Sequence, residues 1–306
     1  MLGTLLRRRF LHYNLDVPMF PSLFRPLALY LALFLPLLAI RPPQEPPAAS
    51  GARILLLPRK LVSGERATLA VLDINGRLTP SVTVEFTNGD KFTTDATGRA
   101  LFVAPLNVGK IFAGIQGRPG RVSSAIVTSA ESPSATQEVS LVPRVASLSD
   151  RLEIYGHGFC GDADANRVTV GGSPALVLAS SPAYLAVLPP ADMNSGPTQV
   201  QVSCAQKSSR AFTVTFVALD LDANSAPLAP GEHRLLTVRV KGSTLRVNLE
   251  ARNLAPDVAE LQGGVSVRTV STGGAENVAK FELVGKQHGN FIISIRLVSP
   301  AGAPRP

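Results

Sequence analysis

Residues 64–105, "GERATLAVLDINGRLTPSVTVEFTNGDKFTTDATGRALFVAP", alternate apolar and polar side chains along short segments. In "SVTVEFT", for example, Val82, Val84 and Phe86 share one parity. Side chains two residues apart lie on the same face of a strand, so this alternation indicates half-buried antiparallel strands. Turn signals separate the segments, at Asn75–Gly76, Asn88–Asp90 and Thr97–Gly98.

The rest of the chain has the composition of a protein built from short strands. Gly and Pro number 25 each among 306 residues, and no long segment carries a helical apolar stripe. An apolar fraction of 45% is ample for packed cores, and the length allows two or three domains. Short strands spaced by roughly ten residues are typical of sandwiches and barrels. We therefore predict an all-β chain of tandem β-sandwiches after an N-terminal segment.

The first predicted unit covers residues 50–130. Its "TDATG" hairpin, followed by "RALFVAP", resembles the bacterial Ig-like domains of surface adhesins of the invasin type. The resemblance implies an immunoglobulin-like sandwich. The residues that occupy the motif are Asp95, Gly98, Ala100 and Phe102. A polar stretch without periodicity, residues 129–138, follows and reads as a linker.

The second predicted unit covers residues 139–218. It contains "LEIYGHGF", then "NRVTVGGSPALVLASSPAYLAVLPP", then "SGPTQVQVSCAQKSSRAFTVTFV", and it resembles the IPT/TIG family of Ig-like domains. Such domains serve as interaction or spacer modules in surface proteins, carbohydrate-active enzymes and receptors, and others sit in DNA-binding proteins, so the resemblance does not fix a function. The residues that fill the family pattern are Gly156, Gly158, Phe159, Val168, Val170, Gly171, Gly172, Val187, Pro189, Gly196, Pro197, Val200 and Val202.

The resemblance assigns structural roles to five of these residues. Gly156, Gly158 and Phe159 would form the end of one strand, with the Phe159 side chain filling the core, and Gly171 and Gly172 would form a turn.

The third predicted unit, residues 219–300, shows alternating strands such as "HRLLTVRVKG" and "NFIISIRLV". On that pattern alone we predict a third Ig-like sandwich.

The first 49 residues read as a targeting segment. Leu27–Ile40 is a run of fourteen residues without a charge, preceded by arginines and followed by a Pro-rich stretch. A membrane-spanning helix needs about twenty apolar residues, so the run fits a signal-peptide core, with Met1 or Met19 as the start. The alternative is an uncleaved inner-membrane anchor over residues 17–40. Either case predicts export, to the periplasm, the cell surface or the medium.

The two cysteines, Cys160 and Cys204, both fall in the second unit. Cys204 shares its parity with Val200 and Val202, so it points to the core if the valines do. In an exported protein a cysteine pair within one domain favours a disulfide. Parity alone also fits a buried free thiol, which stays open.

Two acidic clusters have the D-x-D-x-N spacing that opens a calcium loop. They are Asp162, Asp164 and Asn166, and Asp220, Asp222 and Asn224. Neither continues with the Gly and Glu that an EF-hand loop requires, so we interpret both as Asx turns in connections and predict no metal site. The second cluster is the better calcium candidate, because it lies at a predicted domain junction.

The sequence carries none of the motifs GxSxG, HExxH or CxxC, and His157, His233 and His288 are not grouped. We therefore predict a protein that is not an enzyme and has no cofactor. The net charge of +8 is scattered without a basic run, which argues against nucleic-acid binding. The chain has no Trp, and beyond the leader only Tyr155 and Tyr184, which weakens a sugar-binding interpretation.

These observations predict an exported bacterial interaction, adhesion or spacer module at the envelope or cell surface. Its ligand would be an unknown protein or glycan, bound by loops at sandwich ends or by exposed sheet edges. A membrane would be contacted only through the N-terminal segment, if that segment is uncleaved. The alternatives are an accessory polysaccharide-binding protein and a hydrolase whose site is not contiguous in sequence.

Overall fold

The computed structural model describes residues 53–73, 75–118, 122–130, 137–222, 228–271, 277–289 and 291–298. The chain divides into two compact units, Met1–Ala49 and Ser50–Pro306. The predicted signal or anchor segment belongs to the first unit and lies outside the described residues. Within the part that is described, no helix has the length and apolarity needed to cross a membrane. Apart from a 3₁₀ turn at Ala163–Ala165, the regular elements described there are strands, which confirms the all-β prediction.

The first sandwich consists of two sheets that enclose one apolar core. One sheet has the order β1-β3-β6 and the other the order β2-β8-β7-β4-β5. The core contains Leu69, Val84, Phe86 and Phe102, and the alternation of the sequence had placed Val84 and Phe86 on one face. The strands are β1 (Ile54–Leu56), β2 (Lys60–Val62), β3 (Arg66–Leu72), β4 (Thr83–Phe86), β5 (Lys91–Thr93), β6 (Arg99–Val103), β7 (Gly109–Ile115) and β8 (Val122–Thr128).

The "TDATG" segment forms a tight hairpin turn before β6. The Asp95 carboxylate accepts hydrogen bonds from the backbone N–H groups of Thr97 and Arg99. These bonds favour the charged form, and the hydrogen bond from the Thr97 hydroxyl contributes most to lowering the pKa of Asp95. Gly98 has a φ of +76°, and a Cβ there would lie 2.6 Å from the backbone nitrogen of Thr79, so both conformation and space require glycine.

The second sandwich is built around a core that includes Leu152, Ile154, Phe159, Val200 and Phe216. Strand β13 bends between its two sheets, since its first residues pair with β12 and its last with β14. The strands are β9 (Glu138–Leu141), β10 (Val145–Ser147), β11 (Leu152–His157), β12 (Asn166–Val170), β13 (Ser173–Ser181), β14 (Tyr184–Leu188), β15 (Gly196–Cys204), β16 (Lys207–Ser208) and β17 (Phe212–Asp222).

The third sandwich packs a sheet of order β17-β18-β22-β20 against one of order β21-β19-β23. Its core includes Leu249, Phe281 and Leu283. The strands that follow β17 are β18 (His233–Lys241), β19 (Val247–Asn253), β20 (Ala259–Leu261), β21 (Ser266–Val270), β22 (Val278–Gly285) and β23 (Ile293–Val298).

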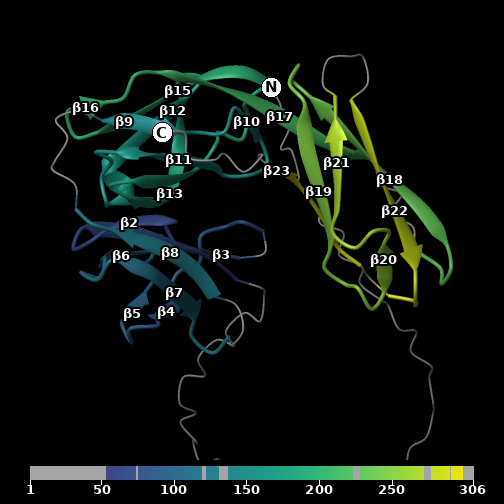
Figure 1. The fold of residues 1–306 in the computed structure, drawn as a ribbon, viewed down its shortest axis with the longest axis horizontal. Coiled ribbons are helices and arrows are strands. Elements are labelled where there is room, and N and C mark those ends of the chain that lie inside the picture. The colour runs from purple at the N-terminus through teal and green to yellow at the C-terminus, as the bar shows by residue number, and fades with distance from the viewer. Residues whose placement is uncertain are drawn as a thin grey trace, which may run out of the picture. The chain divides into compact units, whose positions relative to one another are not determined.

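One strand serves both the second and the third sandwich. Residues 212–216 of β17 pair with β15, and residues 218–222 pair with β18 (Figure 1). The predicted domain boundary between residues 218 and 219 therefore falls inside a continuous strand rather than in a linker. Because β17 carries the ladder hydrogen bonds of both sheets, a bend at this point would break paired backbone groups.

We expect Phe216→Ala to lower the free energy of unfolding by about 3–5 kcal/mol, because Phe216 is fully buried in the second core. Urea unfolding of the purified protein measures the change. Leu101→Ala, at an exposed position, serves as the control and should cost less than about 1 kcal/mol. Equal losses in the two variants would contradict the assignment of this core.

Candidate functional site

The first and second sandwiches meet at an apolar cluster, which we call the junction. Side chains on the outer face of β1 and β3 pack there against side chains from β13 and β14. The two strands β3 and β13 also pair at one position, where Thr68 lies opposite Ser180. The first sandwich contributes Leu56, Ala70 and Leu72, and the second contributes Leu178, Ala179, Tyr184 and Ala186.

A loop of the second sandwich, residues 158–166, docks on β3, and we call it the docking loop. The Thr68 hydroxyl donates a hydrogen bond to the Gly161 carbonyl at 2.8 Å and accepts one from the Ala163 backbone N–H at 3.1 Å. Ser180 donates to the same carbonyl at 2.7 Å. A Cβ on Gly161 would lie 1.9 Å from the backbone oxygen of Arg66, so the loop reaches β3 only because this residue is glycine.

The docking loop is held in shape by the buried amide of Asn166. Its Oδ1 accepts a hydrogen bond from the Cys160 backbone N–H at 2.9 Å, and its Nδ2 donates to the carbonyls of Cys160 and Asp162, each at 2.8 Å. Asp162 caps the 3₁₀ turn Ala163–Ala165 by accepting from the Asp164 N–H. A buried amide with these partners restrains both ends of the loop.

A disulfide joins Cys160 in the docking loop to Cys204 at the end of β15. The two Cα atoms are 5.7 Å apart, and Cys204 lies opposite Asn166 in the ladder of β12 and β15. The predicted bridge is confirmed, and the alternative of a buried free thiol is wrong. The bridge therefore anchors the docking loop to β15, and the Asn166 amide anchors it to the neighbouring strand β12.

Two ion pairs cross the junction. Arg99 donates from Nη1 to Asp164 Oδ1 at 2.6 Å, and Arg59 donates from Nε to Glu153 Oε1 at 3.1 Å. The Arg99 side chain is only 7% exposed, whereas that of Asp164 is 72% exposed. A buried guanidinium needs its counter-charge, so Asp164 in the docking loop neutralises a cation that belongs to the first sandwich.

Both tyrosines of the described residues also lie at the junction. Their ring centroids are 5.1 Å apart, and Tyr155 donates from its hydroxyl to Glu153 at 3.3 Å. Burial raises the pKa of Tyr155 to about 12 and raises that of Tyr184 as well, because the charged phenolate is disfavoured there. Neither ring is an exposed platform on which a sugar could stack.

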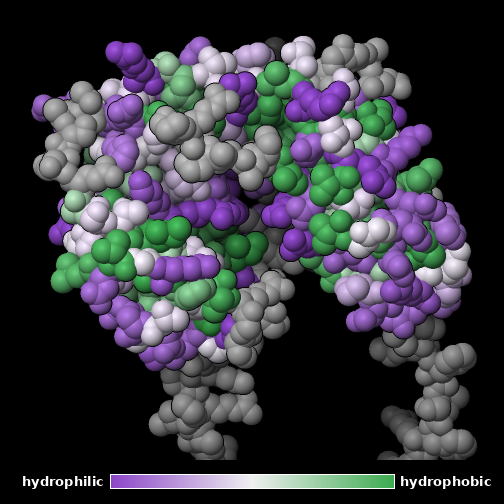
Figure 2. Space-filling model, in the orientation of Figure 1, coloured by the Kyte–Doolittle hydropathy of each residue, from purple (hydrophilic) through white to green (hydrophobic). Residues whose placement is uncertain are grey.

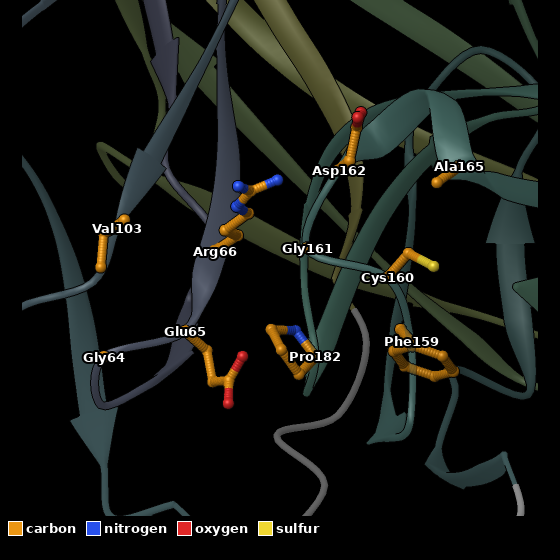
Figure 3. Close-up of a pocket in the computed structure, with 10 residues that line it drawn as sticks. All are labelled: Gly64, Glu65, Arg66, Val103, Phe159, Cys160, Gly161, Asp162, Ala165 and Pro182. Carbon is orange, nitrogen blue, oxygen red and sulfur yellow. The ribbon is translucent and has the colours of Figure 1, made fainter.

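A hollow of about 490 Å³ opens beside the docking loop. Figure 3 shows Glu65, Arg66 and Val103 of the first sandwich on one wall and Asp162 and Pro182 of the second on the other. The lining mixes apolar surface with two carboxylates and a guanidinium. Such a lining suits a ligand that brings both apolar and charged groups.

The five residues of the IPT/TIG strand-and-turn motif occupy two places in the second sandwich. Gly156 is in β11, where a Cβ would lie 2.0 Å from the Glu138 oxygen, and Phe159 is buried in the core. Gly158 opens the docking loop with a φ of +76°, and Gly171 and Gly172 link β12 to β13 with φ values of +61° and +84°. Phe159 and Gly158 therefore lie directly before the bridged Cys160.

The second acidic cluster is not a connection, and our Asx-turn interpretation of it is wrong. Asp220 and Asp222 are strand residues of β17, opposite Arg239 and Thr237 of β18. Their carboxylates form ion pairs with Lys241 at 3.0 Å and with Arg239 at 3.7 Å. Asn224 lies outside the described residues. In the described ranges no group of three His, Cys, Asp or Glu side chains is placed to hold a metal ion.

Sequence reasoning missed the residues that build the junction, above all Thr68, Arg99 and Ser180. Thr68 and Ser180 are buried polar residues inside strands. The sequence signal for Thr68 was its polar side chain among the apolar residues of "ATLAVL", but that pattern does not identify the residue to which Thr68 bonds. The partners of Thr68 and Arg99 come from a loop more than sixty residues away, and only the fold brings them together.

Comparisons with known proteins identify the second sandwich. Residues 139–217 match the family model described as IPT/TIG domain, about a quarter of the chain, and this confirms the resemblance read from the sequence. The invasin-type resemblance of the first sandwich stays a prediction. A search of the curated proteins finds no match.

Similar solved structures include surface and extracellular proteins. SGBP-B of the Bacteroides ovatus mixed-linkage glucan utilization locus, in complex with a heptasaccharide, is 13% identical over 78% of this chain and 71% of that one, with a TM-score of 0.32. The plexin A4 extracellular region is 13% identical over 85% and 24%, with a TM-score of 0.29, and the surface layer protein SbsC 14% identical over 81% and 38%, with a TM-score of 0.21. This chain thus spans less than two thirds of the length of the latter two. At these values the alignments do not bear on ligands or partners.

We expect Gly161→Ala to open the junction, because the added methyl group collides with the backbone of β3. Overpacking at a rigid contact typically costs about 1–3 kcal/mol. Hydrogen–deuterium exchange should show faster exchange in both β3 and the docking loop. Ala165→Ser, an exposed position in the same loop, is the control and should leave exchange unchanged. Unaltered protection of β3 in Gly161→Ala would contradict the docking contact.

We expect the oxidised protein to have an intact mass about two daltons below that of the reduced protein, since bridge formation removes two hydrogens. Replacing both cysteines by alanine should lower the free energy of unfolding by about 4 kcal/mol, given a loop of 44 residues in the chain-entropy model. Urea unfolding measures this loss. A variant as stable as the oxidised protein would show that the bridge does not restrain the docking loop.

Proposed function

We propose that this chain is an exported, non-enzymatic interaction module that acts at a bacterial envelope or cell surface, in adhesion or as a spacer. The observation that carries the proposal is the built junction: a buried apolar cluster, two ion pairs and the Thr68 hydrogen bonds hold two sandwiches together beside a hollow. A pre-organised hollow binds with a smaller loss of conformational entropy than one formed by mobile loops.

Export is supported by the disulfide. Bridges of this kind persist in oxidising compartments and are rare in the cytosol, where thiols are kept reduced. The Cys160–Cys204 bridge lies within a single sandwich and restrains a loop that has a structural task, so oxidation is part of how this fold is maintained. The IPT/TIG match is consistent with a surface module, as is the apolar leader in the sequence.

A binding role is supported by the chemistry of the hollow. Its walls present the Glu65 and Asp162 carboxylates and the Arg66 guanidinium beside Val103 and Pro182. These groups suit salt bridges and apolar contact with a ligand. Away from the hollow, the His233 Nδ1 lies 2.7 Å from the Glu282 carboxylate on the exposed face of the third sandwich.

The proposal is tested with the full chain immobilised on a biosensor. The analytes are envelope proteins and, separately, envelope polysaccharides, both prepared from the bacterium that produces the protein. We expect saturable binding that weakens about tenfold in Glu65→Arg, which reverses a charge in the hollow. Glu85→Arg is the matched control, because Glu85 is an exposed carboxylate on the other sheet of the same sandwich.

Three results would contradict or redirect this proposal. Turnover of ester, peptide or glycosidic substrates by the purified chain would overturn the non-enzymatic role. Equal binding by Glu65→Arg and Glu85→Arg would remove the hollow as the contact. Binding confined to the polysaccharide fraction would favour the alternative of an accessory polysaccharide-binding protein.

A further inference from the structure

The hollow continues along the first sandwich onto an unpaired strand edge. We infer that the partner of this site is an extended peptide segment with apolar and basic side chains, which adds as a strand beside β6. The inference rests on the proposed function, because it names the class of partner that the hollow would take. Four observations carry it: the direction of the β6 backbone groups, the exposure of its side chains, their continuity with the junction, and the charges of the rim.

Strand β6 has one paired edge and one open edge. Within the described residues it pairs only with β3. Gly98 and Ala104, which flank it, direct their backbone groups toward β3, since Val71 donates to the Gly98 carbonyl and Ala104 donates to that of Glu65. Hydrogen-bonding direction alternates along a strand, so Leu101 and Val103, which have the opposite parity, point their N–H and C=O groups away from β3.

The open edge is confined to these two residues. Arg99 has the same parity, but its backbone groups are occupied by Asp95, whose N–H donates to the Arg99 carbonyl at 2.7 Å and whose carboxylate accepts from the Arg99 N–H at 3.2 Å. The turn thus closes one end of the edge. A partner strand would meet two N–H groups and two C=O groups, at Leu101 and Val103, that have no partner among the described residues and lie next to the hollow that Val103 lines.

The side chains on the same stretch are apolar and exposed. Leu101 is 46% exposed and Val103 is 56% exposed, and Leu106 in the loop that follows is still more exposed. Natural proteins usually protect an open edge with lysine, proline or a bulge. The sequence of β6, "RALFV", has neither lysine nor proline. Figure 2 shows further apolar side chains on the visible face of the first sandwich.

The exposed pair lies on the sheet face that the junction covers elsewhere. Leu101 is opposite Thr68 and Val103 is opposite Arg66, and on the same face Ala70 and Leu72 of β3 are buried against the second sandwich. The docking loop therefore covers β3 and contacts β6 at Arg99, through Asp164, while Leu101 and Val103 stay exposed. A strand added to β6 would extend an interface that already exists, with its side chains entering the hollow.

The charge of the rim selects a basic partner. Glu65 and Asp162 line the hollow, and neither forms a salt bridge in the described part of the chain. Arg66 supplies one positive charge, and Arg99 already neutralises Asp164. The rim is left with one carboxylate in excess, which a lysine or arginine of the partner would meet.

The test uses the full chain and a fluorescein-labelled peptide of seven alternating lysine and valine residues, with fluorescence anisotropy as the readout. We expect saturable binding. Methylating the backbone nitrogens of one parity in the peptide should weaken binding about tenfold or more, because those N–H groups bond β6, while methylating the other parity should leave binding unchanged. Val103→Pro, which removes a free N–H and spares the β3 ladder, should weaken binding to a similar extent.

The controls separate this inference from the proposed function. Glu85→Gln should bind the peptide normally, and a peptide of alternating glutamate and valine should bind more weakly. Equal binding of both methylated peptides, no effect of Val103→Pro, or preference for the acidic peptide would overturn the inference. The inference would also be overturned if the chain dimerises and Val103→Pro abolishes the dimer, because a second copy of the chain would then occupy the edge. If envelope binding still falls in Glu65→Arg, the proposed function survives that failure.

Discussion

The contact between the docking loop and β3 centres on one buried hydroxyl. Thr68 is 3% exposed inside an apolar strand, and it bonds both the carbonyl of Gly161 and the N–H of Ala163. A buried polar group without a partner costs about 1–3 kcal/mol, so Thr68 and the loop backbone each need the other. The docking loop can meet this demand because the Asn166 amide and the Cys160 bridge fix its shape.

Those contacts position everything else at this site. The loop that bonds Thr68 also carries Asp164 to the buried Arg99 and places Asp162 on the rim of the hollow. Within the described residues β6 pairs only with β3, so its other edge stays open beside the hollow. The binding features that we propose therefore lie where two sandwiches meet. That placement explains why family membership of one domain leaves function open.

Local patterns in the sequence predicted the strands and the "TDATG" turn, because alternation of period two is a property of a few neighbouring residues. The disulfide was predicted from the expected export of the chain, since the parity of Cys204 also fits a buried free thiol. The junction could not be predicted in this way, since Thr68 and Gly161 are 93 residues apart in the chain. The interpretation of Asp220 and Asp222 was wrong for the same reason, because local composition does not show which distant strand a segment pairs with. Their composition is that of a turn, but pairing with β18 and its two cations places them in a strand.

The most direct test of the account measures the distance between spin labels on the first two sandwiches. Thr93→Cys on β5 and Ser173→Cys on β13 provide exposed attachment sites, and the native cysteines are engaged in their bridge. Pulsed electron–electron double resonance on the labelled full chain should give one narrow distribution of distances between the two labels, and the distribution should broaden in Gly161→Ala. A broad distribution in the protein with native Gly161 would contradict the claim that the docking loop holds the two sandwiches together.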